Sequence, residues 1–481
     1  MPYRDLRAYL SALEEHGKLH HVPTEVDKDW EISAICRRVF QTVPASERPG
    51  LMFDHVRGFE TPVVAGIVGG SPEIYALALS TTVDRIFDKW RDAETHPLPP
   101  VQVATGPCKE RIERDDEVDL GRIPAPVWSV EHDPGPYITA AFVTTCDPDT
   151  GIQNVGTYRV QVKGPNRAGL MISPTQDGRR HIEKNEQRGR STPVAMVLGA
   201  DPTVALVSVS ALPYGVDELA VAGGLRGEPL EVVRCETVDL LVPASAEIVL
   251  EGELLAGERE LEGPFGEYTG YFGPAGDNYV FHVNCVTSRQ RPIYQAFVSQ
   301  MPPSESSCIR RIGREQPMLR HLRDSLGLPV VDVHLKESGG SAAFVVISVR
   351  KEQRSVMVQE VAMAAWSYGR GWGKYLVVVD DDIDVRDTFA VEWAMSFRVQ
   401  PEHDIYVYRD LQAVNLDPST APFSAPKNAP ERLRAGKVLI DATRKHEYPP
   451  AALPPKDHME RVAARWEAYG FGKQPLTAVA A

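Results

Sequence analysis

Two glutamates lie five positions apart in the segment EGPFGEYTGYFG (262–273), which also contains four glycines and four aromatic residues. The GPFG between Glu262 and Glu267 is typical of a turn, so the two carboxylates can converge on one side of a bent chain. Two carboxylates held close in apolar surroundings cannot both ionise cheaply, so one keeps a proton that it can donate. The segment is therefore a candidate acid–base site, and the alternative is a turn with two exposed glutamates.

An arginine stands in a second polar segment, NVGTYRVQV (154–162). Strand alternation puts Val160 and Val162 on one face and Arg159 on the other. The guanidinium fork suits the carboxylate of a substrate or of a glutamate. Gly156 would allow a planar ligand to approach closely. The alternative is an exposed arginine on a strand.

Oxygen-bearing side chains recur in the middle of the chain. Asp177 lies in SPTQDGRRH (173–181), and Glu218 follows the segment LPYG. Carboxylate and amide oxygens suit Mn²⁺, Mg²⁺ or Ca²⁺ rather than zinc. The spacing is long and irregular, so a metal site is one interpretation. His181 is more often a solvated histidine on a helix than a ligand.

Glycines precede a lysine in GRGWGKYLVVVDDDIDV (369–385). They could place Lys374 near a phosphate, although the spacing of a Walker loop and its following helix are missing. The run Asp380–Asp382 could hold a metal, as in a metal-dependent hydrolase, or could close a strand at a surface turn.

Composition narrows the class of protein. The chain has 481 residues, enough for two or three domains, and 43% of them are hydrophobic. A net charge of −14 without a Lys/Arg-rich block argues against nucleic acid as a partner. The six cysteines are scattered singly, so we expect reduced thiols rather than a zinc ribbon. No apolar run is long enough for a membrane span, and the N-terminus is typical of an amphipathic helix, so we expect a cytoplasmic protein.

Three stretches of different pattern must position these side chains. Residues 1–103 mix helical and strand patterns and end in a proline-rich linker. Residues 104–305 contain many short β-branched runs, typical of a β-barrel or sandwich, with one helix near 178–190. Residues 306–481 alternate strands and helices and end in an amphipathic helix at 458–470. Other expected elements are helices at 5–13, 71–79 and 355–368, and strands at 51–56, 62–69, 328–335, 341–350 and 374–385.

Taken in order, the motifs resemble those of the UbiD-type decarboxylases over nearly the whole chain. They are N-x-G-x-Y-R, LGADP, AGGLRGEPLEVV, VPASAEIVLEGE, EGPFGEYTGY and VVDDDIDV. The resemblance implies an α/β (α+β) fold: an N-terminal α/β domain, a central split β-barrel like that of flavin reductases, and a C-terminal α/β domain that forms dimers. It also implies reversible loss of CO₂ from an unsaturated or aromatic acid, with prenylated FMN, Mn²⁺ and K⁺ as cofactors.

The resemblance also assigns residues. Arg159, Glu262 and Glu267 would be the catalytic network, with Glu267 supplying the proton that replaces CO₂. Asp177 stands where the family has a metal-binding histidine, unless the alignment shifts and His181 serves instead. Potassium would bind near Val207 and Ser208. The cofactor set would be Asn154, Val155, Gly156, Thr157, Tyr158, Arg159, Gln176, Asp177, Glu218 and Lys374, and the metal ligands would be Asn154, Asp177 and Glu218.

The substrate class stays open at this point. A monocyclic aryl acid, a pyrrole- or indole-type acid and a fused ring such as phenazine-1-carboxylate all suit the resemblance. The segment AFVSQMPPSESS (296–307), expected near the pocket, does not choose among them. Alternatives are a decarboxylase of cinnamate-like α,β-unsaturated acids and a flavin-phosphate-binding protein without catalysis. Expected partners are a flavin prenyltransferase that supplies the cofactor and further copies of the chain in a homodimer or larger homo-oligomer, with no membrane.

Overall fold

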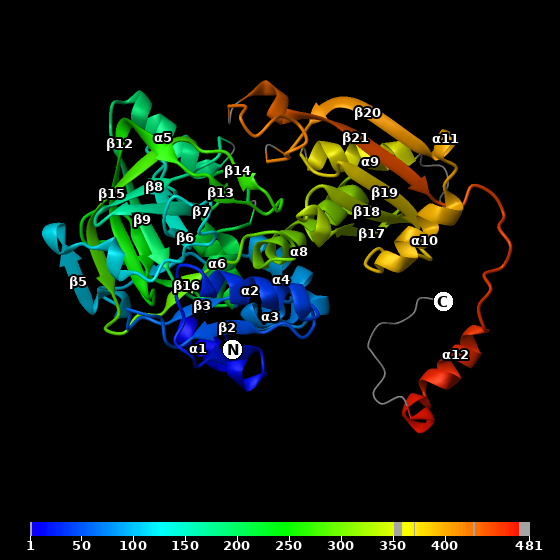
Figure 1. Cartoon of the computed structure of the whole chain (residues 1–481), viewed down its shortest axis with the longest axis horizontal. Coiled ribbons are helices and arrows are strands. Elements are labelled where there is room, and N and C mark those ends of the chain that lie inside the picture. Colours follow the sequence, from blue (N-terminus) through cyan, green and yellow to red (C-terminus); the bar gives the residue numbers. More distant parts are fainter. Residues whose placement is uncertain are drawn as a thin grey trace. The chain divides into compact units, whose positions relative to one another are not determined.

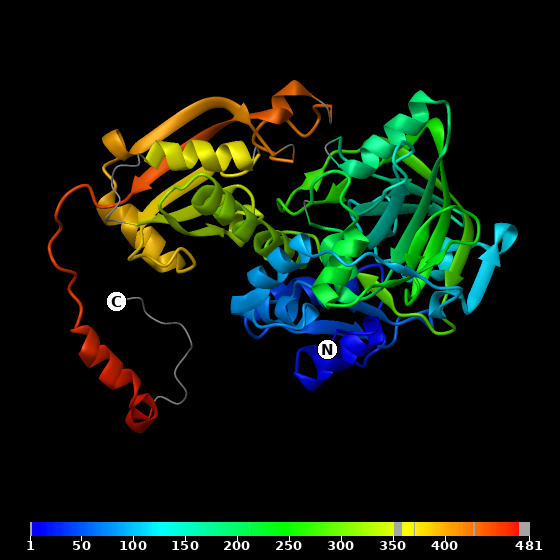
Figure 2. The ribbon, with the colours of Figure 1, turned by 180° about the vertical axis from the view of Figure 1, so that it is seen from behind.

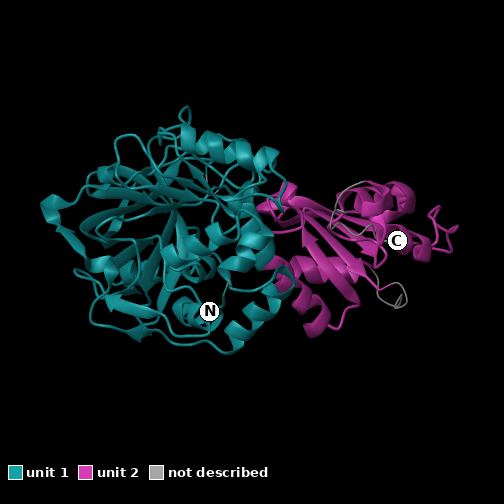
Figure 3. Cartoon of the chain, turned by 90° about the horizontal axis from the view of Figure 1, so that it is seen from below, with its two compact units in different colours: residues 1–313, 416–432 teal, residues 314–415, 433–481 magenta. Residues whose placement is uncertain are grey.

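The chain divides into two compact units, coloured teal and magenta in Figure 3. The first comprises residues 1–313 and 416–432, and the second comprises residues 314–415 and 433–481. The division into three domains at residues 103 and 305 stays a prediction. The computed structural model describes residues 2–174, 176–210, 212–350, 358–369, 371–414, 416–426 and 429–470.

The first unit begins with a small α/β layer around a four-stranded sheet in the order β1-β2-β3-β16 (Figure 1). Ser71 and Asp5 cap the first turns of α3 and α1 by accepting backbone N–H groups, as expected for helix N-termini. The helices expected at 5–13 and 71–79 are confirmed, whereas the strands expected at 51–56 and 62–69 are shorter than predicted and end at Phe53 and Ala65. The elements are α1 (Leu6–Glu15), β1 (Leu19–Val22), α2 (Glu31–Thr42), β2 (Gly50–Phe53), β3 (Val63–Ala65), α3 (Pro72–Ala78), α4 (Ile86–Thr95) and, from much later in the chain, β16 (Tyr294–Ala296).

A closed antiparallel barrel of six strands forms the middle of the first unit, which confirms the mixed α/β class with a central barrel. The sheet runs β12-β9-β6-β7-β8-β15, and pairing of β12 with β15 closes it. Closure removes the free strand edges that would otherwise need protection. The strands are β6 (Tyr137–Cys146), β7 (Gln153–Gly164), β8 (Arg167–Leu170), β9 (Thr192–Leu198), β12 (Ile248–Glu262) and β15 (Gly276–Ser288), with β5 (Arg111–Arg114) added beside β15.

Shorter elements surround the barrel. The predicted helix near 178–190 is α5 (Asp177–Gln187). Helices α6 (Pro202–Val207) and α7 (Glu218–Arg226) follow β9, and a short hairpin follows β12. The remaining elements are β4 (Val101–Gln102), β10 (Glu231–Arg234) and β11 (Leu241–Pro243) in one small sheet, the hairpin β13 (Phe265–Gly266) and β14 (Phe272–Gly273), and α8 (Glu305–Arg320), which contains the boundary of the units.

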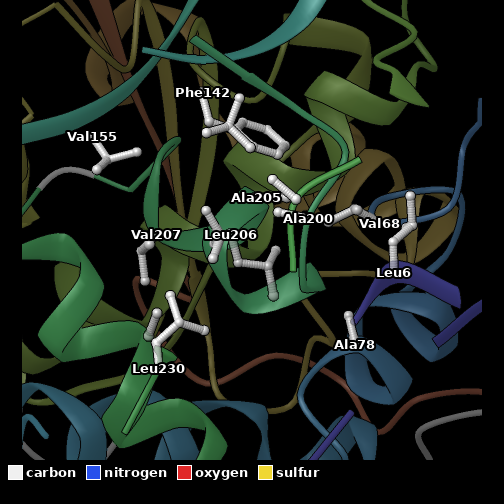
Figure 4. Packing of buried hydrophobic residues seen from close by; sticks show 14 of the residues in the cluster. Leu6, Val68, Ala78, Phe142, Val155, Ala200, Ala205, Leu206, Val207 and Leu230 are labelled. Carbon is white, nitrogen blue, oxygen red and sulfur yellow. The ribbon is translucent and has the colours of Figure 1, made fainter. Parts of the chain in front are cut away.

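One hydrophobic core joins the N-terminal layer to the barrel. Leu6 and Val68 from the layer belong to the same buried cluster as Phe142 and Val155 from the barrel and Leu206 from α6 (Figure 4). Each fully buried aliphatic or aromatic side chain of this kind contributes about 1.5–3 kcal/mol. The N-terminal layer therefore packs against the side of the barrel that contains β7.

The second unit is a five-stranded sheet in the order β17-β18-β19-β21-β20, seen from behind in Figure 2. Val345 and Ile347 of β18 pack with α9, and Val346 packs with α10, so the two helices cover opposite faces. The expected strands are confirmed. The elements are β17 (Val330–Leu335), β18 (Phe344–Val349), α9 (Val358–Tyr368), β19 (Tyr375–Asp380), α10 (Thr388–Arg398), α11 (Pro401–Asp404), β20 (Ile405–Gln412), β21 (Arg434–Ala442) and α12 (Lys456–Ala463).

Four further expectations concern two helices, the cysteines and membrane spans. The helix predicted at 355–368 is α9, and residues 355–357 lie outside the described part. The terminal helix predicted at 458–470 ends at Ala463, and a separate 3₁₀ turn covers Trp466–Tyr469. All six cysteines are free thiols. No helix in the described ranges is both long and apolar enough to cross a bilayer.

Candidate functional site

Arg159 holds both glutamates of the EGPFGE segment. Its Nε and Nη2 donate to Glu262 Oε1 and Oε2 at 2.9 and 2.8 Å, and its Nη1 donates to Glu267 Oε1 at 2.6 Å. The exposed fractions of the side chains are 9% for Arg159, 0% for Glu262 and 13% for Glu267. The predicted convergence of the two acids is confirmed, and a guanidinium between them lets both lie close in a nearly enclosed place.

The glycines of the segment make room for this cluster. β12 ends at Glu262, and Gly263 follows with a φ of +85°, a conformation that other residues rarely adopt. A Cβ on Gly263 would lie 3.2 Å from Arg159 Nη2, and a Cβ on Gly273 would lie 3.2 Å from Glu267 Cγ. The pairing of β13 with β14 puts Gly273 opposite Phe265, two residues before Glu267. The glycine-rich composition is therefore explained by the close approach of chain to side chain.

Two residues of the site were not predicted from the sequence. Asn278 of β15 donates from Nδ2 to Glu262 Oε2 at 2.8 Å. Tyr137 of β6 stacks on Phe265 with ring centroids 4.1 Å apart. Burial and the charge of Glu262 raise the pKa of Tyr137 far above its usual range, so its hydroxyl stays protonated. The one available signal was an asparagine at the start of the largely apolar strand pattern NYVFHV.

The charges of the cluster reinforce one another. Burial by itself would lower the pKa of Arg159, but Glu267 and Glu262 reverse this effect and hold it above its usual value. Arg159 therefore stays cationic at any physiological pH. Close by, burial raises the pKa of Asp133 to about 6, although Arg159 and His132 act in the opposite direction. Asp133 Oδ2 accepts the backbone N–H groups of Trp128 and Ser129 at 2.9 and 2.8 Å.

A cavity of about 360 Å³ borders Glu267 within the first unit. Its walls are mostly apolar, and its size falls in the range of small-molecule sites. Arg432 in the wall donates to the carbonyls of Pro422, Phe423 and Ala425, so it braces the loop around it. The lining residues are His132, Glu267, Thr269, Tyr271, Phe272, Gly273, Pro274, Leu416, Pro418, Ala421, Pro422, Phe423 and Arg432.

The predicted metal ligands lie around the start of α5. Glu218 Oε2 accepts the N–H of Val155 at 2.9 Å, and the Asn154 amide, oriented by its hydrogen bonds, donates to Glu218 Oε1 at 3.3 Å. Burial raises the pKa of Glu218 to about 7, with smaller contributions from Asp217 and Asp177. A buried carboxylate with this environment would be stabilised by a cation.

Both candidates for the third ligand face the same space. A cavity of about 10 Å³ is lined by Asn154, Asp177 and His181 among others. Asp177 opens α5 and His181 lies one turn later, which puts both on one side of the helix. His181 Nδ1 lies 3.0 Å from Thr145 Oγ1. Across the described ranges, no three His, Cys, Asp or Glu side chains gather closely enough to hold a metal by themselves, so an amide ligand such as Asn154 would be needed.

The other predicted cofactor residues have varied surroundings. Gly156 gives no open approach, because a Cβ there would lie 2.3 Å from Tyr158 Oη. Thr157 N donates to Ser208 O at 2.8 Å, next to the place expected for potassium. Gln176 Oε1 accepts the N–H of Ser173 at 2.7 Å. Lys374 precedes β19 in the second unit, so its phosphate contact stays a prediction.

The aspartate run after β19 is held by arginines. Arg398 donates to Asp380 Oδ2 at 3.2 Å and to Asp382 Oδ1 at 2.9 Å. Arg444 donates to Asp382 Oδ2 at 2.6 Å. These ion pairs engage the oxygens that a metal would need. They therefore favour the interpretation in which the aspartate run closes a strand over the one in which it holds a metal.

Three family models match consecutive parts of the chain. All describe UbiD, 3-octaprenyl-4-hydroxybenzoate carboxy-lyase: its N-terminal domain matches residues 10–94, its Rift-related domain 100–302 and its C-terminal domain 309–442. A phenolic acid decarboxylase of Bacillus subtilis (strain 168) is 32% identical over 455 residues, which cover 92% of this chain and 93% of that protein.

Solved structures extend the similarity. The UbiD-class enzyme HmfF of Pelotomaculum thermopropionicum, in complex with FMN, is 36% identical and matches with a TM-score of 0.83 over 94% of this chain and 98% of its own. An evolved dimeric form of HmfF contains prFMN. The vanillic acid decarboxylase of Sedimentibacter hydroxybenzoicus is 29% identical, with a TM-score of 0.83 over 98% of this chain and 99% of its own.

Proposed function

This chain belongs to the UbiD family of carboxy-lyases, and from that membership we propose that it reversibly removes CO₂ from an aromatic or heteroaromatic acid with prenylated FMN as cofactor. The observation that carries the proposal is the Glu262–Arg159–Glu267 cluster beside an apolar cavity. The names of the relatives support an aromatic acid, and the FMN and prFMN bound to HmfF support the cofactor.

The two glutamates have different roles in this proposal. Glu267 borders the cavity and supplies the proton to the carbon that loses CO₂. Glu262 is enclosed and fixed by Arg159 and Asn278, so it holds the guanidinium in place. Arg159 in turn orients the carboxylate of the substrate. Prenylated FMN, when bound, supplies the electron sink that no amino-acid side chain offers.

Residues near the cluster fit the proposed cofactors. Gln161 is two residues from Arg159 on the same face of β7, and its Oε1 is buried without a hydrogen-bond partner in the described chain. A polar ring system could satisfy this atom. Asn154, Asp177 and Glu218 offer the hard oxygen ligands that Mn²⁺ takes. We propose that K⁺ binds near Val207 and Ser208, whose carbonyls also accept hydrogen bonds from Ser210 and Thr157. We propose that the cofactor comes from a flavin prenyltransferase and that the chain forms a homodimer or larger homo-oligomer.

Asp177→Ala is expected to lower Mn²⁺ affinity by at least about 10-fold, since a charged oxygen ligand is removed. The measurement is the metal and flavin content per chain after dialysis. His181→Ala is the matched comparison, because that side chain lines the same cavity. Full retention of Mn²⁺ in Asp177→Ala together with loss in His181→Ala would transfer the ligand role to His181.

Gly273→Ala is expected to lower kcat roughly 10-fold, because its Cβ would displace Glu267 by a few tenths of an ångström. Gly164→Ala is the control, since nothing lies within 4 Å of a Cβ there. The measurement is the steady-state rate of CO₂ release by the two flavin-loaded variants. Equal rates would mean that the position of Glu267 does not limit turnover.

The experiment that tests the function itself is a substrate panel. Aromatic, heteroaromatic and cinnamic acids are offered to protein co-expressed with a flavin prenyltransferase and to protein made without one, and CO₂ release is measured. Turnover of an aromatic acid only in the co-expressed sample is the expected result. Turnover restricted to cinnamic acids would favour the α,β-unsaturated class, and a bound prenylated flavin without any turnover would favour a non-catalytic flavin-binding protein.

A further inference from the structure

The cluster has little capacity left for an acidic substrate. Arg159 uses Nε and Nη2 on Glu262 and Nη1 on Glu267, so three of its five N–H groups are engaged and one on each Nη is left for a substrate. The cluster contains two carboxylates and one guanidinium. A carboxylic acid that enters as its anion adds another negative charge to a poorly hydrated place, which is costly without a further cation.

A second arginine lies close to Glu267. Arg310 of α8 stacks its guanidinium over the ring of Tyr268, the residue after Glu267, at 3.9 Å from the ring centroid. Its one hydrogen bond to a described residue runs from Nη1 to Ser306 Oγ at 3.3 Å. Burial lowers the pKa of Arg310, while Tyr268 and Glu267 act in the opposite direction, so its charge is felt at Glu267. It stays protonated, because an arginine keeps its proton even when desolvated.

The stacking leaves the edge of the guanidinium for a ligand. The face of Arg310 lies on an aromatic ring, and the donors of a guanidinium lie in its plane. Those donors match the two oxygens of a carboxylate. Both residues belong to the first unit, as do Arg159 and Glu267, so this argument uses contacts within one compact body.

We propose that Arg310 is a substrate-positioning residue that binds a carboxylate of the aromatic acid beside Glu267. The inference rests on the proposed function. Two carboxylates could supply the same chemistry: the one that is removed, or a second one on an aromatic dicarboxylic acid. In the first case Arg310 shares the reacting group with Arg159, and in the second case it selects dicarboxylic substrates.

Equilibrium binding to the flavin-loaded protein separates these cases. Isothermal titration calorimetry is carried out with benzoate, terephthalate and uncharged benzamide on wild type, Arg310→Gln and Arg310→Lys. Arg111→Gln is the control for net charge, since it removes an exposed guanidinium with a side chain that is 48% exposed. A loss of about 10- to 100-fold in affinity is expected in Arg310→Gln for carboxylate probes, with benzamide unchanged and Arg310→Lys intermediate.

The pattern of losses identifies the carboxylate. Weaker binding of both benzoate and terephthalate assigns Arg310 to the reacting group, whereas a loss confined to terephthalate assigns it to a second group. Wild-type affinities in Arg310→Gln, equal losses for benzamide, or no preference of wild type for either carboxylate over benzamide would overturn the proposal. Binding does not need turnover, so failure of decarboxylation would leave this result interpretable by itself.

Discussion

Glu267→Gln is expected to lose about 10²- to 10⁴-fold in kcat while it still binds flavin, because it removes only the proton that general acid catalysis needs. The amide oxygen of glutamine can still accept from Arg159 Nη1, which now lies 2.6 Å from the carboxylate. The fold and the cavity wall therefore stay intact. The measurement is the rate of CO₂ release together with the flavin absorption of the purified variant.

A matched control tests whether the loss of a carboxylate from this part of the chain is enough to lower the rate. Glu260→Gln removes a carboxylate from the same stretch of chain, where it pairs with Lys163 and Arg167 instead of Arg159. It should turn over like wild type. Deuterium from the solvent should enter the product of wild type and Glu260→Gln. Rates of Glu267→Gln within a few-fold of wild type would remove Glu267 from the role of proton donor.

Arg159→Met is expected to abolish decarboxylation and to destabilise the first unit by about 3–5 kcal/mol, the usual cost of leaving a buried charge unpaired. Glu262 is fully enclosed, and without the guanidinium its carboxylate keeps neutral neighbours, the Asn278 amide at 2.8 Å and the Tyr137 hydroxyl. The measurement is the shift of the denaturation midpoint in urea, followed by a probe within the first unit. A single free energy of unfolding for the whole chain is not well defined, because the chain has two units.

The double variant Arg159→Met with Glu262→Gln is the control for this prediction. Neutralising Glu262 removes the buried charge, so much of the lost stability should return. Activity should not return, because neither the guanidinium nor the fixed Glu262 is restored. Unchanged stability in Arg159→Met would mean that the three side chains do not depend on one another as their contacts indicate. Recovery of both stability and activity in the double variant would mean that catalysis does not need Arg159.

Local patterns were sufficient for many elements. Capping residues such as Ser71 and continuous apolar runs such as that of β18 gave the right element types, because they depend on neighbours in the sequence. The C-terminal helix was predicted too long, since its apolar periodicity continues beyond the residue where the chain leaves the helix. The barrel was expected from many short strands, yet it also needs pairings between residues far apart in the chain, such as Leu170 of β8 with Tyr279 of β15.

In the candidate site too, some residues could be predicted from short motifs and others could not. Glu262, Glu267 and Arg159 stood out through residue types within short motifs. Asn278 did not, because its role depends on which strand lies beside β12. Gly156 was interpreted as space for a ligand, whereas the hydroxyl of Tyr158, two residues along the same strand, fills that space.

By itself the sequence determined the family, the class of fold and the pair of acids with their arginine, because short ordered motifs carry that information. Tertiary structure alone decided that one guanidinium bridges both acids, that Glu267 and not Glu262 borders the cavity, and that Arg310 stacks on Tyr268, the residue after Glu267. The physical reason is that charge pairing and burial depend on distances between residues about a hundred positions apart, such as Arg159 and Glu262, and local patterns do not encode those distances.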